Sequence, residues 1–546
     1  MSSTAFSDDH IVRSRSARYA IAPWRCFVLP LAFVAACSGD DGPTTTDPEP
    51  VASVTVSPNA SALVTGATQR LTATLYDGAG TVLTGRTISW ASSQNAIVTV
   101  DATGLVRGIA QGQATITATA EGKSGSAAIS VSIFSFVAVS TGGAHTCALT
   151  ANGAAYCWGR GEAGQLGIPS PAVCASIGLP CNTIPVAVQG GIIFTRLTGG
   201  GAHTCGLTSD GTAYCWGQNS NGQLGDGTLI SRNSPVRVST TLSFSSINAG
   251  EAHTCALTST GAGRCWGRND GGQLGDGTTT RRFTPTPVAI DLAFQAIDAG
   301  GFGGPIDNPF PSFSCALSTT GDGYCWGENI LGNLGGGTTG FPRPTPSPVS
   351  GGLKFTSLTV GLDDHACAIT ASGQAYCWGA NFNGSLGDGT STERDVPVPV
   401  TGGLIFVQLA AGGYNGHTCG RTGGGVAYCW GDNEAGQVGD GTTVIRLTPT
   451  AVTGGLTFTS LDAGYRHTCG IASNNVVHCW GSNGAGQLGD NSTATSPVPV
   501  RVLGQAGPTA PAVSGSVSEK REIQNNRSPA AMVSVKCPTR TCSSHR

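Results

Sequence analysis

The chain has 546 residues, of which only 11% are charged, and its formal net charge is −3. This balance provides no basic field for nucleic acid, so we expect no nucleic-acid partner. The length is sufficient for two folded domains. The 20 cysteines would be unusual in the reducing cytosol, and they favour an oxidising compartment.

Residues 1–36 have the pattern of an export signal. Four arginines precede a short apolar run from Cys26 to Ala36, and this run is too short to cross a bilayer. The junction Val34-Ala35-Ala36-Cys37 resembles the lipobox of bacterial lipoproteins. That resemblance implies cleavage before Cys37 and attachment of lipid to its sulfur. We therefore expect an envelope protein at the outer membrane, the periplasmic face or the cell exterior, in contact with membrane only through its anchor.

Residues 37–50 form a polar, proline-containing linker. Residues 51–132 contain short segments of alternating polar and apolar residues separated by Gly and Asn turns. This pattern predicts a β-sandwich with Trp90 as its main aromatic core residue. The segments resemble the bacterial immunoglobulin-like domains of the second group, which implies a stalk or spacer on the cell surface.

Residues 134–504 contain seven copies of one repeat, each marked by Cys-Trp-Gly with a second cysteine ten residues upstream. Successive copies of Cys-Trp-Gly are 58, 50, 60, 52, 52 and 50 residues apart. Each copy encodes a β-rich hairpin with one weaker strand before it and one after it. Four short strands in each of seven units predict an all-β chain in which a seven-bladed β-propeller follows the small sandwich. Ring closure gives every blade two neighbours and removes the exposed strand edges.

The hairpin of the second repeat defines a strand register. If Cys205 lies opposite Cys215, the residues Ser209, Asp210 and Gly211 form the loop, and its last residue must adopt the left-handed conformation. The seven copies supply Gly or Asn there, at Gly153, Gly211, Gly261, Gly321, Gly373, Gly425 and Asn475. In this register the two cysteines form a non-hydrogen-bonded pair with Cα atoms roughly 4.5 Å apart, which allows a disulfide.

We therefore predict one disulfide within each hairpin. The pairs are Cys147–Cys157, Cys205–Cys215, Cys255–Cys265, Cys315–Cys325, Cys367–Cys377, Cys419–Cys429 and Cys469–Cys479. Zinc binding by these pairs is the alternative, although their spacing is not that of the usual zinc knuckle. Cys174 and Cys181, which lie in an insertion of the first repeat, are expected to pair with each other, and the same is possible for two cysteines in the tail.

The recurring string HTCAL-x3-G-x-x-YCWG-x-N-x3-GQLGDGT, followed by Pro-Val, resembles the repeats of the regulator of chromosome condensation family. This resemblance covers about residues 134–503 and also implies a seven-bladed propeller. The departures are local. Gly161 replaces the usual Asn in the first copy, Phe313 replaces a His in the fourth, and Gly336 replaces the Asp of the Gly-Asp-Gly turn.

Several recurring side chains could be mistaken for ligand sites. We interpret them as structural, because each recurs once per blade and a blade's width separates neighbouring copies. They are the histidines His145, His203, His253, His365, His417 and His467, the aspartates Asp226, Asp276, Asp388, Asp440 and Asp490, and the tryptophans Trp158, Trp216, Trp266, Trp326, Trp378, Trp430 and Trp480. Zinc, calcium and sugar binding are the respective alternatives. We find no catalytic motif, and we predict no catalytic residue, metal or cofactor.

Two insertions break the repeat. Ile168 to Thr183 lengthens the Gly-rich loop of the first copy, and Gly300 to Phe313 contains extra residues before the hairpin of the fourth. Insertions in repeat proteins map to loops that often bind partners. We predict that Phe302, Phe310 and Phe313 contribute to a partner-binding surface, with neutral loop drift as the alternative.

These observations predict a monomeric, non-catalytic protein that binds a protein or a cell-surface ligand. One alternative is an inhibitor of a secreted or periplasmic enzyme. Another is nucleotide exchange on a small GTPase, as the resemblance implies, although no exchange residue can be carried over. A third is an enzyme that acts on polysaccharides, which requires non-repeating carboxylates near one mouth of the channel. Residues 505–546 have a weak pattern and are expected to be disordered.

Overall fold

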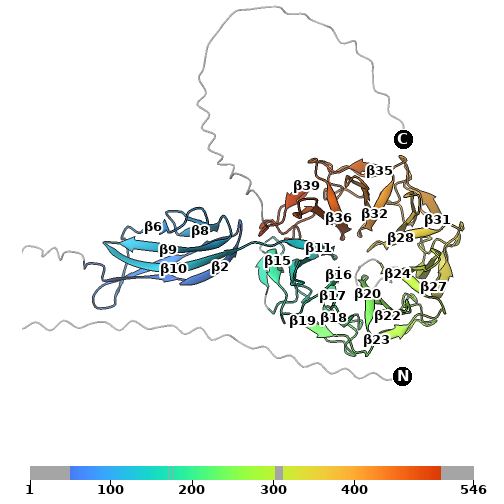
Figure 1. The fold of residues 1–546 in the computed structure, drawn as a ribbon, viewed down its shortest axis with the longest axis horizontal. Coiled ribbons are helices and arrows are strands. Elements are labelled where there is room, and N and C mark those ends of the chain that lie inside the picture. The colour runs from blue at the N-terminus through green and yellow to red at the C-terminus, as the bar shows by residue number, and fades with distance from the viewer. Residues whose placement is uncertain (1–48, 170, 175, 302–311, 506–546) are drawn as a thin grey trace, which may run out of the picture. The chain divides into compact units, whose positions relative to one another are not determined.

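The computed structural model describes residues 49–169, 171–174, 176–301 and 312–505. Every regular element in these ranges is a β-strand (Figure 1), which confirms the all-β fold class. It follows that no helix in the described part of the chain could span a membrane. The predicted signal, Cys37, the two residues Phe302 and Phe310, and the tail beyond Gln505 lie outside these ranges.

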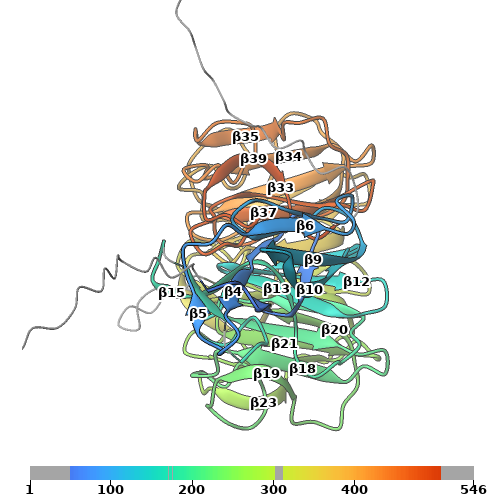
Figure 2. The same cartoon turned by 90° about the vertical axis from the view of Figure 1, so that its left-hand side faces the viewer.

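The immunoglobulin-like region contains ten short strands in three sheets. One sheet has the order β1-β4-β5, the second β2-β10-β9-β6 and the third β3-β8-β7. The strands are β1 (Ser53–Ser57), β2 (Ala60–Val64), β3 (Thr68–Arg70), β4 (Thr72–Tyr76), β5 (Val82–Leu83), β6 (Ser89–Ser92), β7 (Val98–Val100), β8 (Leu105–Gly108), β9 (Gly112–Ala120) and β10 (Lys123–Ser132). Figure 2, turned by 90° from Figure 1, labels β4, β5, β6, β9 and β10 of this region.

The core of this region is aliphatic. Its most buried residues are Leu71, Val98, Val106, Ile116 and Ile129. Trp90 lies on β6 and is only partly buried against this cluster. Trp90 is the one aromatic residue of this cluster, in agreement with the prediction, but alternating Val, Ile and Ala side chains fill the centre and the indole is only partly buried.

Residues 136–501 form seven sheets, or blades, numbered here in chain order. The innermost strands are β11 (Phe136–Thr141), β16 (Arg196–Gly199), β20 (Phe244–Ala249), β24 (Phe294–Ala299), β28 (Phe355–Val360), β32 (Phe406–Ala411) and β36 (Phe458–Ala463). The second strands are β12 (His145–Thr150), β17 (His203–Leu207), β21 (His253–Thr258), β25 (Phe313–Ser318), β29 (His365–Thr370), β33 (His417–Thr422) and β37 (His467–Ala472).

The third and outermost strands complete the blades. The third strands are β13 (Ala155–Arg160), β18 (Ala213–Gly217), β22 (Gly263–Gly267), β26 (Gly323–Asn329), β30 (Ala375–Gly379), β34 (Ala427–Gly431) and β38 (Val477–Gly481). The outermost are β15 (Leu179–Ala187), β19 (Arg232–Arg237), β23 (Arg282–Pro287), β27 (Gly340–Pro348), β31 (Arg394–Pro399), β35 (Arg446–Ala451) and β39 (Ser496–Arg501). Blade 1 has an additional strand, β14 (Ala172–Cys174), outside β15.

Within each blade the strands pair in chain order and antiparallel, from the channel outwards. Each blade packs against the next, and β11 of blade 1 packs against β36 and β37 of blade 7. The blades therefore close into a ring, as Figure 1 shows. Because every sheet has a neighbour on both faces, the ring buries apolar surface that a single blade would expose.

The hairpin register is as predicted. Cys205 lies opposite Cys215, and the amide of Thr208 donates to the carbonyl oxygen of Thr212 at 3.0 Å. The last loop residue has φ of +78° at Gly211 and +61° at Asn475. The cysteines of each hairpin are joined, with Cα atoms 4.1–4.2 Å apart in the seven pairs.

Tryptophan side chains hold neighbouring blades together. The indole of Trp266 is completely buried, and its Nε1 donates to the carbonyl oxygen of Gln223 in the preceding blade at 3.0 Å. A Cβ atom on Gly225 would lie 2.6 Å from the same Nε1, and φ there is +68°, so the Gly-rich loop needs glycine at this point. The same bond recurs in every blade, and Trp158 closes the ring on Gln487 of blade 7. These indoles fill blade interfaces and are not accessible to a sugar.

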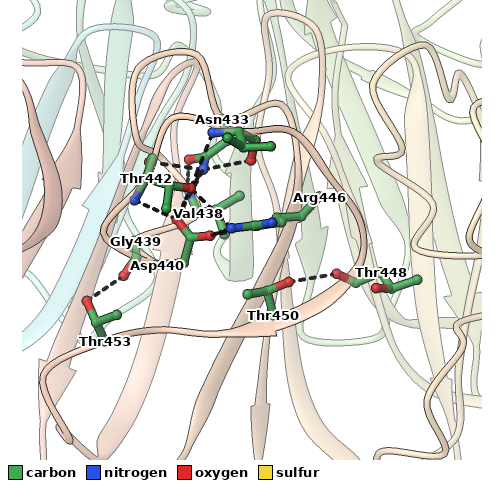
Figure 3. Close-up of polar contacts among 10 residues, drawn as sticks. Asn433, Val438, Gly439, Asp440, Thr442, Arg446, Thr448, Thr450 and Thr453 are labelled. Carbon is green, nitrogen blue, oxygen red and sulfur yellow. Dashed lines mark hydrogen bonds and ion pairs between the residues drawn. The ribbon is translucent and has the colours of Figure 1, made fainter. Parts of the chain in front are cut away.

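The recurring aspartates form clasps within the Gly-rich loops. In blade 6, Asn433 donates to Asp440 and accepts from the amide of Val438, while Arg446 ion-pairs with Asp440 (Figure 3). Thr442 donates to the same carboxylate through its amide and its hydroxyl. Partial burial disfavours the charged carboxylate, but the bonds from Thr442 and Arg446 outweigh this effect and lower the pKa of Asp440. Protein donors thus occupy both oxygens, which supports the structural interpretation of these aspartates.

Candidate interaction face of the propeller

One end of the propeller carries the loops that differ most between repeats. Because neighbouring strands are antiparallel, the loop between the first and second strands of a blade lies at the same end as the loop between its third and fourth strands. We call this end the loop face. The insertion from Ile168 to Thr183 follows β13 and extends into β15, and in the sequence the second insertion falls between β24 and β25. The tight hairpin turns lie at the opposite end.

The insertion of blade 1 is built into the fold. Cys174 and Cys181 form a disulfide with Cα atoms 5.7 Å apart, next to the short ladder between β14 and β15. Ser176 donates its hydroxyl to the carbonyl oxygen of Gly484 in blade 7 at 2.8 Å. The amide of Asn491 donates to Thr183 at 2.9 Å. These bonds fasten the insertion to the neighbouring blade.

Histidines beside the loop face link each blade to the next. His145 Nε2 lies 2.8 Å from Thr204 Oγ1, and that hydroxyl donates to the carbonyl oxygen of Gln165. Since the hydroxyl has a single proton, it must accept from His145 Nε2–H. Burial lowers the pKa of His145 to about 4 and that of His203 to about 3, so both rings are neutral near pH 7. Equivalent bonds occur from His203, His253, His365, His417 and His467.

Phe313 takes the place of this histidine in blade 4. Its side chain is completely buried in β25. The residue of blade 5 that corresponds to the accepting Thr is Ala366, which belongs to the same buried cluster. An apolar pair thus replaces the polar pair found at the other junctions. This placement corrects the prediction that Phe313 contacts a partner, because its ring fills the interface between two blades.

His365 differs from the other histidines in a second bond. Its Nε2 lies 2.9 Å from Thr418, and its Nδ1 lies 2.8 Å from the carboxylate of Asp363. Thr418 donates its own proton to Ser385, so His365 Nε2 must carry a proton. A second proton is then required between Nδ1 and Asp363. Asp363 therefore has a buried partner at its Oδ1 atom.

The innermost strands surround a channel with a volume of about 360 Å³. Two carboxylates face it, Asp298 from blade 4 and Asp462 from blade 7. Each accepts a backbone amide from the next blade, Val360 at 2.9 Å and Thr141 at 2.7 Å respectively. Burial raises the pKa of Asp298 to about 7 and that of Asp462 to about 6. These residues fasten neighbouring blades at the channel wall and remain close to titration near neutral pH.

A side-chain contact at the loop face joins blades 7 and 3 and passes over blades 1 and 2. Tyr465 of blade 7 donates its hydroxyl to Glu251 of blade 3. The two side chains lie over Gly143 and Gly201, where a Cβ atom would collide with them. Burial raises the pKa of Glu251 to about 7, although the bond from Tyr465 and the charge of Arg268 oppose that shift. Neither residue was predicted from the sequence. The sequence feature that could have revealed the pair is that Glu251 and Tyr465 each replace the glycine that blades 1 and 2 carry at the same repeat position.

At the loop face of blades 6 and 7, charged side chains pair with one another. Arg466 lies 2.7 Å from Glu434 and 3.5 Å from Asp432, and its guanidinium lies 5.2 Å from the centre of the Tyr414 ring. Arg466 of blade 7 is therefore paired with two carboxylates of blade 6. In the described residues, no group of three or more His, Cys, Asp or Glu side chains is placed to hold a metal ion.

Blades 4 and 5 present apolar side chains to solvent at the same face. The exposed fractions are 51% for Ile330, 87% for Phe341 and 62% for Phe382. Ile330 and Phe382 lie in the loops that follow β26 and β30, and Phe341 lies at the start of β27. We call these three residues the apolar surface. Blade 6 also exposes Val444 (57%) and Ile445 (38%) in the loop between β34 and β35, but the two phenyl rings of blades 4 and 5 have no aromatic equivalent in that loop.

A closed ring of seven four-stranded blades with one recurring hairpin defines a β-propeller protein built from sequence repeats. The repeats match the family described as regulator of chromosome condensation (RCC1) repeat at residues 152–207, 210–257, 265–303, 372–419 and 424–471. A second description of the same repeat matches residues 136–165, 194–223, 244–273, 355–385 and 458–487. Together these matches cover more than half of the chain, which therefore belongs to the RCC1 repeat family. Residues 50–131 match the bacterial Ig-like domain of group 2.

Relatives share the repeats but differ in length. The chain is 29% identical over 330 residues to human E3 ubiquitin-protein ligase HERC2, covering 60% of this chain and 6% of that protein. It is 28% identical over 319 residues to the ultraviolet-B receptor UVR8 of Arabidopsis thaliana, covering 58% of each. The chain thus spans well under two thirds of these relatives.

Solved structures confirm the propeller fold. Prp20p from Saccharomyces cerevisiae, whose structure was described with its binding to Gsp1p and histones, aligns with a TM-score of 0.54 at 21% identity. The alignment covers 65% of this chain and 87% of that one. Human WBSCR16 aligns with the same TM-score at 20% identity, over 62% and 88% of the two chains. At these identities the likeness establishes the fold alone.

Proposed function

We propose that this chain is a non-catalytic binding protein whose propeller recognises a protein partner through the loop face of blades 4 and 5. The observation that carries this proposal is the exposed apolar surface formed by Ile330, Phe341 and Phe382. Exposed aromatic and aliphatic residues that interrupt a repeat are typical of a docking surface. RCC1-repeat proteins similar to this chain include one described with its binding to a partner and to histones, which is compatible with this role.

The recurring polar residues support a role without chemistry. The recurring polar residues are occupied in structural bonds, either between blades, as from His203 to Thr254, or within one blade, as between Asp440 and Arg446. The channel carboxylates Asp298 and Asp462 also accept backbone amides. The loop face therefore offers a partner its shape, its apolar area and its charge, which are the properties that protein interfaces use for recognition.

The test is capture of the partner by full-length protein on intact cells, using a photoreactive crosslinker followed by mass spectrometry. The double variant Ile330→Ser, Phe382→Ser should lose the captured protein. Ile405→Ser is the matched control, because Ile405 is 53% exposed but lies near the hairpin turn at Gly373, on the opposite face. Equal capture by both variants would reject the loop face as the binding surface.

We propose further that the protein acts at the cell envelope, attached through Cys37, with the immunoglobulin-like domain as a spacer. The lipobox-like residues Val34 to Cys37 and the eight disulfides support this location. Metabolic labelling with a radioactive fatty acid tests the anchor. The wild-type protein should incorporate label and Cys37→Ser should not, and label in the variant would contradict the proposed attachment site.

A further inference from the structure

A buried carboxylate without a partner lies where blades 4 and 5 meet at the loop face. Asp364 precedes β29 and is only 8% exposed. Its Oδ1 atom is buried and receives no hydrogen bond, and none of the described ion pairs includes it. A buried carboxylate is normally paired or accepts several hydrogen bonds, because its desolvation is otherwise costly. The neighbouring Asp363 follows that rule through its bond to His365, whereas Asp364 does not.

A second unsatisfied acceptor lies next to it. Asn333 is completely buried, and its Oδ1 has no donor. The backbones of the two residues lie on either side of Gly379. A Cβ atom on Gly379 would meet the carbonyl oxygen of Asp364 and, at 3.2 Å, the Cα atom of Asn333. In blade 2 the equivalent Gln223 uses its side-chain oxygen to accept the amide of Asn221 at 2.9 Å. Asparagine is one methylene shorter, so blade 4 leaves this acceptor unused.

The surrounding charge is negative. Glu328 is the penultimate residue of β26, and the side-chain nitrogen of Asn333 donates to its carbonyl oxygen at 2.5 Å. Burial raises the pKa of Asp364 well above its ordinary value, and the charges of Asp363 and Glu328 add to that shift. Burial likewise raises the pKa of Glu328, although the nearby charge of Arg268 opposes it. Arg268 is itself ion-paired with Asp270 at 3.2 Å.

Within the described residues, no Lys or Arg forms an ion pair with Glu328 or Asp364. The sequence from Phe302 to Pro311, which completes this loop, contains no basic residue either. The unsatisfied acceptors and the excess negative charge would therefore be satisfied by a cationic hydrogen-bond donor that neither the described residues nor residues 302–311 supply. The exposed side chains of Ile330 and Phe382 lie in loops of the same two blades.

We propose that Glu328, Asn333 and Asp364 form a binding site for an arginine or lysine side chain of the protein partner, and that Ile330 and Phe382 contact apolar residues flanking that side chain. This inference rests on the proposed function and names the chemistry its partner must present. An ammonium or guanidinium group supplies several N–H donors to the carboxylates and the amide oxygen at once. Because the site is mostly buried, such a pair is screened by salt less than a surface pair.

A stability measurement separates a binding residue from a structural one. Asp364→Asn removes an uncompensated buried charge, so the Tm of the isolated full-length protein should rise at pH 8. The folded-state pKa of Asp364 is raised, so wild-type stability falls as pH rises above the unfolded value, and the advantage of the variant should shrink towards pH 4. A lower Tm for Asp364→Asn at pH 8 would overturn the proposal, because it would mean that a cation or donor of the chain itself already pairs with this carboxylate.

A binding measurement tests the ligand class. The probe is an acetylated and amidated pentapeptide with arginine between leucines, compared with versions that carry lysine or norleucine in place of arginine. Calorimetry should show binding of the arginine or lysine peptide to full-length protein, with at least about tenfold weaker binding to Asp364→Asn and Glu328→Gln. Glu393→Gln is the matched control, since Glu393 is an exposed carboxylate of blade 5, and it should bind as wild type does.

Two outcomes would overturn the inference without affecting the proposed function. Equal binding of the norleucine peptide would mean that only apolar contact matters. Stabilisation of wild type by calcium, lost in Asp364→Asn, would make the cluster a metal site. If the peptides fail but crosslinking still captures a partner that Ile330→Ser, Phe382→Ser loses, the loop face binds protein without this cationic contact.

Discussion

The junction between blades 2 and 3 and the junction between blades 4 and 5 use the same strands with different chemistry. In the first, neutral His203 donates across the interface to Thr254 at 2.9 Å. In the second, Phe313 packs in the same cluster as Ala366 and no polar atom is involved. All four side chains are completely buried. Either pair satisfies the interface, and a mixed pair would leave a polar group unsatisfied, so the two positions must change together.

The comparison extends to the solvent side of these blades. Blade 2 keeps the clasp, in which Arg232 ion-pairs with Asp226 at 2.9 Å, whereas blade 4 has Gly336 in place of the aspartate. Blade 4 also lacks the glutamine that satisfies the loop amide, and Asn333 leaves its oxygen unpaired. The departures of blade 4 are therefore of two kinds. The departure inside the ring, at Phe313, is compensated by a matching change in blade 5. The departures at the loop face are not compensated within the described residues, and there a partner would supply the missing groups.

The strongest test of this contrast is Phe313→His. The variant places an imidazole opposite Ala366, loses the apolar ring and leaves buried nitrogens without a partner. We expect a loss of about 3 kcal/mol in the free energy of unfolding, measured by urea titration.

The control is a double-mutant cycle. Adding Ala366→Thr should recover at least about 1 kcal/mol, because it recreates the His–Thr bond of the other junctions. If the two effects simply add, the two positions are not energetically coupled and the comparison of the junctions fails.

Local rules explain why much of the fold was predictable. The hairpin turn depends on three adjacent residues, so the left-handed position at Gly211 and its replacement by Asn475 follow from the sequence. The same register placed Cys205 opposite Cys215. Phe313 was misassigned because its explanation lies in Ala366, more than fifty residues away, and becomes clear only when blades are compared as neighbours in space.

The candidate site was less predictable for the same reason. Glu251 and Tyr465 are 214 residues apart, and their contact requires a closed ring. The unsatisfied state of Asp364 depends on the shorter side chain of Asn333 in another blade and on the absence of a nearby cation in the described residues. Trp90 does pack against the core of the sandwich, but its partial burial was not predictable, because it depends on how completely the small aliphatic side chains fill the centre.

A second prediction compares the bridges of a regular and an irregular blade. Replacing both cysteines by serine, as Cys255→Ser, Cys265→Ser in blade 3 or Cys315→Ser, Cys325→Ser in blade 4, should cost about 2–3 kcal/mol in each case. The two losses should be equal, because both bridges span a sequence separation of 10 residues. Urea midpoints measure both. A clearly larger loss in blade 4 would show that its missing clasp and polar junction leave that blade locally weak.

The smallest expected effect concerns the channel wall, where blade 3 carries an asparagine and blade 4 an aspartate at the same repeat position. Asn248 and Asp298 occupy the same repeat position at the channel wall. Burial raises the pKa of Asp298 from 3.8 to about 7, so its protonated form favours folding at low pH, and that contribution is lost as pH rises through 7. Asp298→Asn should fold, since blade 3 already uses asparagine, and it should gain Tm relative to wild type between pH 4 and pH 8.

At low pH the same variant should be slightly less stable, because the carboxyl group accepts amides from both Ala299 and Val360 and an amide oxygen replaces only one acceptor. The buried histidines, whose lowered pKa values destabilise the fold below about pH 6.5, are present in both proteins and cancel in the difference. A Tm difference that does not change with pH would mean that Asp298 has an ordinary pKa. The channel wall of blade 4 would then differ from that of blade 3 in charge at every pH above about 4, and burial would not control the protonation of Asp298.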